Sequence, residues 1–361
     1  LSAKNYVFVT WATGIDMSTG RPIEAPGARY EDGPAMVMPS ALGGHNWHPM
    51  AYSPQTGLVY IPAQEIAGVY VADADFEYQP GQWNNGVEPP SDVTQLRFDM
   101  LPAEMQAMFA DVPPEAMAAM AQQMLDDIPP DLVGGHLLAW DPVAQREVWR
   151  FDHGLPWTGG ALATAGGLVF QGSPYGMLAA YGATSGEKLW EMHTGSGVIA
   201  APITYRVGDT QYVAVVSGWG GVFGLLGSSA AKAAGVVSEG RILAFALDAN
   251  EQPPERDEPE QFVVGPIAHD STPEQIAEGK ALYDRYCLVC HGYGAVGGGV
   301  IEDLRTKSER IFDNYTAIVI EGRRANKGMP GFSDVLDEQD SDAIRAYVLS
   351  RRDLLVAAAG G

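Results

Sequence analysis

Gly135-His136-Leu137-Leu138-Ala139-Trp140 is the stretch that decides the fold of the larger part of this chain, because its pattern occurs three times. The other copies are Gly176-Met177-Leu178-Ala179-Ala180-Tyr181 and Gly240-Arg241-Ile242-Leu243-Ala244-Phe245. Short apolar runs that return after about 40 residues, separated by turn residues, are typical of four-stranded propeller blades. The pattern therefore predicts an all-β propeller over residues 1–250.

Tryptophans accompany the repeat at fixed places. The first two copies end on Trp149 and Trp190, and Trp47 and Trp157 precede two similar Gly-Leu-Val runs at equal spacing. A single blade cannot cover its own faces, so stacked neighbours supply the core, and we expect Trp149 and Trp190 to dock one blade on the next. A β-sandwich is the alternative, but it does not explain the repeated ending.

The number of blades is too small for a closed ring. Residues 1–250 hold roughly three blades and part of a fourth, whereas propellers usually have about four to eight. The first residues, Leu1 to Val7, have the pattern of the middle of a strand. We therefore expect the C-terminal part of a longer polypeptide, whose N-terminal half would be a partner of this chain.

One insertion interrupts the all-β pattern. Residues 91–131 contain six methionines among Ala, Glu and Gln, broken by prolines. This composition favours helices, near 103–110 and 114–126. Methionine at helical spacing is typical of packing against a protein surface, so we prefer packing on the propeller to a copper site. A lid over a substrate entrance and a contact with the C-terminal domain are both compatible with it.

Cys287-Leu288-Val289-Cys290-His291 contains the only two cysteines of the chain, in the C-x-x-C-H order of c-type haem attachment. Both thiols can bond the haem, and His291 can bind its iron. Met329, the only methionine after residue 270, is the candidate sixth ligand. His/Met ligation suits electron transfer. A structural disulfide is one alternative, and a redox C-x-x-C is another, although the βαβ pattern that accompanies the latter is absent.

The surrounding sequence predicts a small all-α class I cytochrome c domain at 268–361. Thr272, Pro273 and Gln275 form a helix start, and apolar residues at helical spacing then lead to Cys287. A last helix begins near Asp340. Gly279 lacks a side chain where these helices would cross, and we expect Tyr347 to pack over it. Residues 251–267, acidic and rich in proline, are predicted to be a linker.

Composition excludes some partners. The chain has 22 basic and 45 acidic residues, a formal net charge of −23. Nucleic acids and anionic membranes are therefore not expected as partners. No apolar run is long enough to span a bilayer.

Several motifs together resemble those of a known family. They are Trp11-Ala12-Thr13-Gly14-Ile15-Asp16, Gly43-Gly44-His45-Asn46-Trp47-His48-Pro49, Pro156-Trp157-Thr158-Gly159-Gly160 and Ser217-Gly218-Trp219-Gly220-Gly221, followed by the cytochrome. Residues 1–355 resemble the C-terminal half of a quinohaemoprotein alcohol dehydrogenase, a pyrroloquinoline quinone (PQQ) propeller fused to cytochrome c. The resemblance implies part of an eight-bladed ring that holds the quinone on its axis beside a calcium ion.

The resemblance also implies site residues. It places Asn46 and Trp47 on the quinone, with Trp219 and then Trp157 as weaker candidates. The alternatives are structural: Asn46 could close a turn, and each tryptophan could pack between blades. The family's catalytic aspartate and calcium ligands belong to the other half, so no carboxylate of residues 1–250 is assigned to those roles. His45 and His48 flank the pair, and we assign neither a function.

The resulting expectation is a periplasmic enzyme that oxidises alcohols with PQQ. Electrons would pass through haem c to a soluble copper protein or cytochrome. The cofactor carries the hard chemistry, and the protein positions it. Two rivals remain. One is a non-catalytic electron carrier or scaffold propeller with a fused cytochrome c. The other is a haem-d1 nitrite reductase, whose cytochrome precedes its propeller, against the order found here.

Overall fold

A computed structural model describes residues 2–31, 35–74, 76–78, 84, 86–87, 91–92, 134–220, 240–247, 249, 264–297 and 301–359. These residues form two compact units, one built from strands and one from helices. The predicted helical insertion at 91–131 lies outside the described residues except for Ser91 and Asp92. Of the predicted linker, only residues 264–267 are described.

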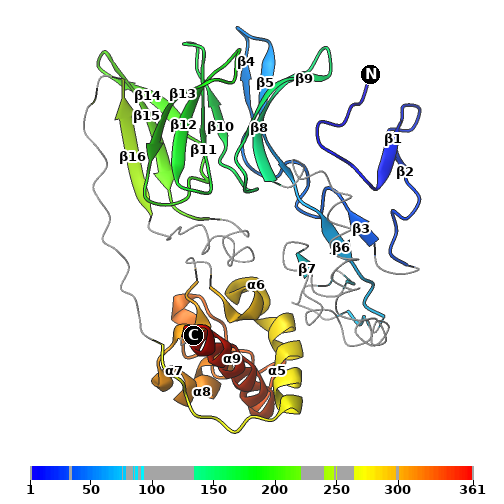
Figure 1. Cartoon of the computed structure of the whole chain (residues 1–361), viewed down its shortest axis with the longest axis vertical. Coiled ribbons are helices and arrows are strands. Elements are labelled where there is room, and N and C mark those ends of the chain that lie inside the picture. Colours follow the sequence, from blue (N-terminus) through cyan, green and yellow to red (C-terminus); the bar gives the residue numbers. More distant parts are fainter. Residues whose placement is uncertain are drawn as a thin grey trace. The chain divides into compact units, whose positions relative to one another are not determined.

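The strands of the first unit form five sheets among the described residues. Two have four strands in sequence order: β4 (Ala51–Ser53), β5 (Leu58–Glu65), β8 (Gly134–Asp141) and β9 (Arg146–Asp152), and then β10 (Ala161–Ala163), β11 (Leu168–Gly172), β12 (Met177–Gly182) and β13 (Lys188–His193). Three smaller sheets pair β1 (Ala12–Asp16) with β2 (Arg21–Glu24), β3 (Ala35–Val37) with β6 (Gly68–Tyr70) and β7 (Ser91–Asp92), and β14 (Ile203–Val207) with β15 (Thr210–Ser217) and β16 (Arg241–Ala246). Figure 1 shows the sheet of β14 to β16, the sheet of β10 to β13 and the sheet of β4, β5, β8 and β9 side by side.

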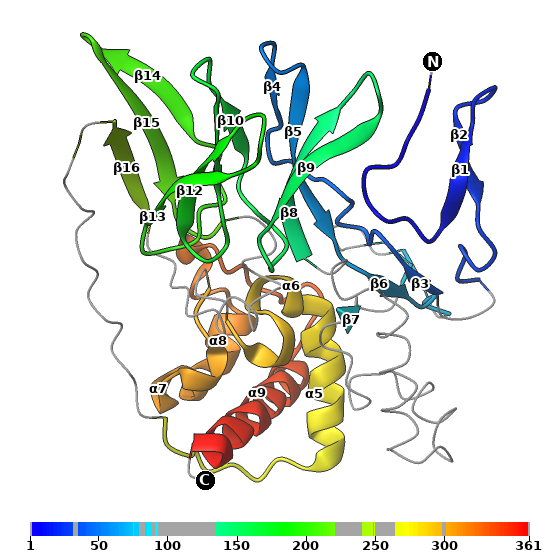
Figure 2. The same ribbon diagram turned by 45° about the horizontal axis from the view of Figure 1, so that its top comes forward.

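The sequence repeat is also a repeat of structure. The three copies lie in β8, β12 and β16, which are each the third strand of their sheet. The Gly-Leu-Val runs after Trp47 and Trp157 become β5 and β11, the second strands of the two four-stranded sheets. Both tryptophans precede the first strand of their sheet by the same number of residues. Equivalent sequence positions therefore occupy equivalent strands, as expected for blades (Figure 2).

Trp149 docks one four-stranded sheet on the next, as predicted. Its indole N–H donates to the Ala183 carbonyl at 3.1 Å, and the Tyr60 hydroxyl donates to the same oxygen at 2.9 Å. The ring also covers Gly186, where a Cβ would lie 2.7 Å from it. Glycine is suited to this turn because its φ is +70°. Trp190 of β13 makes the corresponding contact with the next sheet. Its ring meets Phe245 of β16 edge-on, at 5.3 Å between ring centroids.

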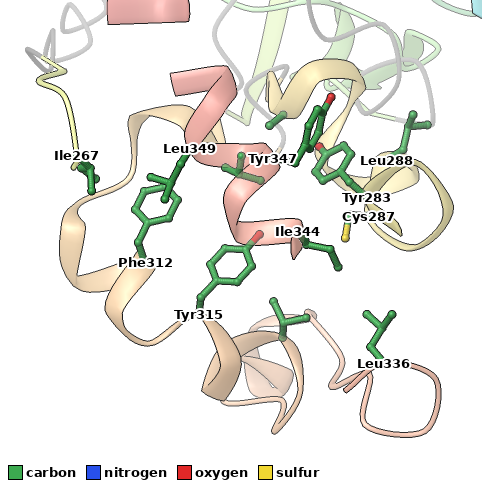
Figure 3. Packing of buried hydrophobic residues seen from close by; sticks show 13 residues of the cluster. Ile267, Tyr283, Cys287, Leu288, Phe312, Tyr315, Leu336, Ile344, Tyr347 and Leu349 are labelled. Carbon is green, nitrogen blue, oxygen red and sulfur yellow. The ribbon is translucent and has the colours of Figure 1, made fainter. Parts of the chain in front are cut away.

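The second unit consists of short helices around one apolar cluster (Figure 3). Its elements are α5 (Pro273–Tyr286), α6 (Leu288–His291), η4 (Tyr293–Ala295), η5 (Leu304–Thr306), α7 (Glu309–Asp313), α8 (Tyr315–Val319), η6 (Ala325–Lys327) and α9 (Glu338–Ala359). The predicted start of α5 is confirmed: Thr272 caps the helix by accepting from the Gln275 amide at 3.2 Å. The last helix begins at Glu338, two residues before the predicted start.

Helices α5 and α9 cross at Gly279, as predicted. A Cβ at this position would lie 1.8 Å from the carbonyl oxygen of Ala343, so the two backbones touch directly. Tyr347 packs against Tyr283 of α5, with ring centroids 5.1 Å apart. The three atoms nearest to a Cβ on Gly279 are backbone atoms of Ala343 and Ile344. The approach is so close that backbone, and not a side chain, fills the space.

Candidate functional site

The C-x-x-C-H motif lies where one helix ends and the next begins. Cys287 is the C-cap of α5 and the N-cap of α6, and its carbonyl accepts from the His291 amide at 2.9 Å. Cys287 is buried, Cys290 is exposed, and both thiols are free. The disulfide alternative is thus not supported. In Figure 3 the sulfur of Cys287 points toward the side of the cluster on which Ile344 and Leu336 lie.

Burial controls the protonation of this motif. It raises the pKa of the Cys287 thiol to about 12, with smaller contributions from Cys290 and Asp284. It lowers the pKa of His291 to about 4, helped by the charge of Lys307. The imidazole is therefore neutral near pH 7, the form that binds metals. Its Nδ1 is buried and has no hydrogen-bond partner among the described residues. These properties fit a haem-binding histidine.

Met329 is presented by a fixed loop. Gly328 adopts a left-handed conformation, φ +89°, and ends η6. The Met329 amide then donates to the Arg324 carbonyl at 3.3 Å, and the Phe332 amide donates to Val319 at 2.9 Å. Met329 packs, partly buried, against the same apolar cluster that includes Cys287. The structure thus brings the predicted haem-attaching and sixth-ligand segments to one cluster.

On the propeller, Asn46 is used by its own turn. Its side-chain amide donates to the Leu42 carbonyl at 3.0 Å, and its oxygen accepts from the Trp47 amide at 2.9 Å. This geometry agrees with the turn-closing alternative. An amide has two N–H groups and two lone pairs, so one of each remains for a ligand. Trp47 is 54% exposed and can offer its ring as a contact surface.

His48 connects the two tryptophans that precede neighbouring sheets. Its ring stacks on Trp47 at 4.2 Å between centroids and meets Trp157 edge-on at 5.1 Å. Burial lowers the pKa of His48 to about 4, and its Nε2 has no partner among the described residues. The sequence placed His48 beside Asn46 and Trp47 but did not predict its contact with Trp157.

The segment that contains Trp157 is held by buried amides from two sheets. The Trp157 amide donates to Gln64 Oε1 at 3.2 Å, and Gln171 Nε2 donates to Thr158 Oγ1 at 3.1 Å and to the Gly159 carbonyl at 2.8 Å. His153 in turn contacts Gln171 at 2.8 Å. These bonds stabilise a positive φ of 64° at Trp157, which is unusual for a bulky residue.

The segments that precede the first strands of three sheets meet beside Trp157. A Cβ on Gly160 would lie 2.7 Å from both Pro49, before β4, and Ala201, before β14. The Ala161 amide donates to the Pro49 carbonyl at 2.9 Å. Trp219, which follows β15, is almost fully buried, and Trp47 precedes β4 of a different sheet. The residues predicted to bind the quinone therefore come from segments outside the strands.

A separate cleft of about 140 Å³ lies between β9 and the β12–β13 hairpin. It is lined by Phe151, Asp152, His153, Ser173, Tyr175, Met177, Ala179, Tyr181, Lys188 and Glu191. Lys188 pairs with Glu191 and lies over the Phe151 ring. None of the predicted cofactor residues lines this cleft. Within the described ranges, no group of three or more His, Cys, Asp or Glu residues is arranged to hold a metal ion. No described helix is both long and apolar enough to cross a membrane.

Comparison with known proteins gives two family matches. Residues 17–213 match the model described as "Glucose/ethanol/alcohol dehydrogenase, beta-propeller domain". Residues 274–348 match the model described as "Cytochrome C oxidase, cbb3-type, subunit III". The two matches fall on the strand unit and on the helical unit.

Individual relatives match along nearly the whole chain. Quinohemoprotein alcohol dehydrogenase ADH IIB of Pseudomonas putida is 41% identical over 97% of this chain and 46% of its own length. The quinohemoprotein alcohol dehydrogenase of Comamonas testosteroni is 37% identical, over 98% of this chain and 46% of its own. The solved structure of ADHIIG from Pseudomonas putida HK5 superimposes with a TM-score of 0.82 at 33% identity, over 98% of this chain and 48% of that one. The chain therefore spans about half the length of the relatives it matches.

Proposed function

Because the chain belongs to the quinohaemoprotein alcohol dehydrogenase family, with a PQQ propeller and a cytochrome c domain, we propose that it is the electron-transferring part of an alcohol-oxidising enzyme. The two domains imply PQQ and haem c as cofactors, and calcium is typical of the family. The proposed enzyme works in the bacterial periplasm, and its electrons leave through haem c to a soluble copper protein or cytochrome.

The observation that carries this proposal is the helical turn with Cys287, Cys290 and His291. The chain would attach haem through the two thiols and would bind its iron with the neutral imidazole of His291 and the Met329 thioether. When bound, haem c supplies a one-electron redox centre. The apolar cluster shields Cys287 from water, and the Met329 amide is hydrogen-bonded to the Arg324 carbonyl in the loop that follows η6.

For the quinone we propose Asn46, Trp47 and Trp219. When bound, PQQ supplies a two-electron acceptor for the hydride of an alcohol. Trp47 offers an exposed aromatic face, and the remaining N–H of Asn46 offers one donor. Trp219 would contribute a second ring from the segment after β15. The hydrogen bonds that Asn46 makes within its turn fix the direction of its free N–H.

We further propose that the rest of an eight-bladed ring covers apolar strands exposed in this chain. Ile203 and Val207 of β14 are 60% and 63% exposed, and Ile23 of β2 is 50% exposed. Apolar side chains left exposed on these strands are suited to burial against a neighbouring blade. The catalytic base and the calcium ligands would belong to those additional blades, and alcohol oxidation would require them.

The haem proposal is tested by Met329→His. A histidine in place of the thioether should lower the reduction potential and remove the weak long-wavelength absorption of Met–iron ligation. Met17→His, at a methionine that is 52% exposed in the strand unit, is the matched control. Survival of that absorption in the Met329 variant would show that another group binds the iron.

The quinone proposal is tested in the complete enzyme with Asn46→Ala. Loss of one hydrogen bond to a charged cofactor costs roughly 1.5–3 kcal/mol, about tenfold to a hundredfold in affinity. PQQ titration of the apo-enzyme measures this change, with haem content as the folding control. An unchanged affinity with a lower melting temperature would assign Asn46 to the turn alone. The rival function, a carrier or scaffold without quinone, predicts neither quinone absorbance nor haem reduction by ethanol.

A further inference from the structure

A basic region stands out in a chain whose formal net charge is −23. Residues 305–327 contain six basic side chains and three acidic ones. The basic residues are Arg305, Lys307, Arg310, Arg323, Arg324 and Lys327. The region therefore carries a local charge opposite to that of the whole protein.

The fold brings two parts of this region together. Lys307, directly after η5, forms an ion pair with Glu302. Arg324 and Lys327, at η6, are close enough for their charges also to stabilise the Glu302 carboxylate. Lys327 is exposed and Arg324 is half-buried. In the described part of the chain, neither makes an ion pair with a carboxylate. One carboxylate thus faces three cations, and the excess positive charge is open to solvent.

The same three cations flank the proposed haem ligands. The Met329 amide donates to the carbonyl of Arg324, and Lys327 is two residues from Met329. Leu304 of η5, three residues before Lys307, packs against the apolar cluster that includes Cys287. The excess charge therefore lies beside the two segments through which an electron would leave the iron.

We propose that Lys307, Arg324 and Lys327 form the docking surface for an acidic redox protein that accepts electrons from haem c. The proposal rests on the proposed haem site. One electron passes per encounter: ferrous haem becomes ferric, and the partner's one-electron centre is reduced. Complementary charges orient such encounters and speed association. Nucleic acids and anionic membranes fit less well, because such extended polyanions would reach beyond this surface to the acidic remainder of the chain, whereas a small protein can contact the surface alone.

The test compares two small oxidants of opposite charge with the reduced, haem-containing chain. Ferricyanide is an anion, and tris(phenanthroline)cobalt(III) is a cation. In Arg324→Glu/Lys327→Glu at low salt, we expect the rate with ferricyanide to fall roughly threefold to tenfold, and the rate with the cobalt complex to rise. Near 1 M salt, where the Debye length is about 3 Å, the variants should converge. The control is Arg21→Glu/Arg206→Glu, which makes the same charge change at exposed residues of the strand unit.

Opposite shifts of the two rates are decisive. A changed haem potential, as expected if these cations only neutralise the haem propionates, would move both rates in the same direction and overturn the proposal. An equal effect of the control pair would also overturn it, because net charge alone would then explain the rates. Replacement by Gln at Arg324 and Lys327 should give shifts in the same direction but smaller.

A second readout does not depend on electron transfer. Hexacyanocobaltate is a redox-inert trianion, and calorimetric titration should detect its binding to the wild-type chain but not to Arg324→Glu/Lys327→Glu. Equal binding to both would refute the docking surface. A chain without a haem absorption band would instead refute the proposed haem site, and the titration would still decide the surface.

Discussion

The crossing of α5 and α9 predicts a large effect from a single methyl group. In Gly279→Ala, the new Cβ would lie 1.8 Å from the Ala343 carbonyl oxygen, whereas ordinary contacts begin near 3.4 Å. The neighbouring atoms are backbone, so no side chain can rotate away. The two helices must move apart until this contact reaches an ordinary distance, or their crossing angle must change.

The magnitude follows from two opposing terms. Overpacking costs about 1–3 kcal/mol and sometimes more, and a contact this short belongs at or above the upper end. Alanine recovers up to about 1 kcal/mol of helix propensity relative to glycine. A net loss of about 2 kcal/mol lowers the melting temperature of a domain of this size by roughly 10 °C. Thermal unfolding followed at the helical circular dichroism band measures it.

The control is Gly265→Ala in the same unit. A Cβ there meets nothing within 4 Å and the backbone φ is not positive, so the melting temperature should stay or rise slightly. If Gly279→Ala melted like this control, the helices would not cross as closely as described, and the explanation given for Gly279 would be wrong.

Three further predictions concern buried groups. Trp149→Phe removes the indole N–H that donates to Ala183 and should destabilise the strand unit by about 1–3 kcal/mol in urea; an unchanged midpoint would deny its docking role. Burial, then the charges of Arg150 and His153, lower the pKa of His136 to about 3. The folded pKa is thus below the unfolded value of about 6.5, so stability present above pH 6.5 is lost as the pH falls toward 3. His136→Leu should reduce the loss between pH 7 and pH 4.5 by about 2–3 kcal/mol, and parallel pH curves would contradict this. Arg352 donates to the carbonyls of Gly265, Arg305 and Lys307, and a lysine cannot make these three hydrogen bonds together. Arg352→Lys should therefore speed proteolysis near residues 305–307. Resistance to proteolysis equal to that of the wild type would refute this role of Arg352.

Sequence patterns predicted the parts of the fold that depend on local signals. The apolar repeat identified β8, β12 and β16 as equivalent strands, and Thr272 identified the start of α5. The family inferred from the motifs is also the family that the comparisons find. The sheet of β3, β6 and β7 was not predicted. Its strands have only two or three residues, and the pairing of Val69 with Ser91 joins segments without a repeat.

The candidate sites also have parts that local sequence motifs predict and parts that depend on tertiary contacts. The C-x-x-C-H motif is contiguous, so the sequence alone could propose haem attachment. Turn closure by Asn46 was one of the alternatives, but its partner Leu42 depends on how the loop turns, and the contact of His48 with Trp157 depends on how two sheets approach each other. Motifs therefore predicted a segment of the propeller as the quinone site, but not which of its side chains already make hydrogen bonds or ring contacts within the chain.

The segment from Trp157 to Gly159 shows why its shape is set before any cofactor arrives. These residues lie outside the strands, so their buried backbone groups need other partners. Gln64 and Gln171 supply them from two different sheets, and His153 holds Gln171 in turn. Burial lowers the pKa of His153 to about 4, so this link stays neutral near pH 7. A ligand beside Trp157 would contact a surface whose shape is fixed by the side chains that support it. This arrangement favours a precise site.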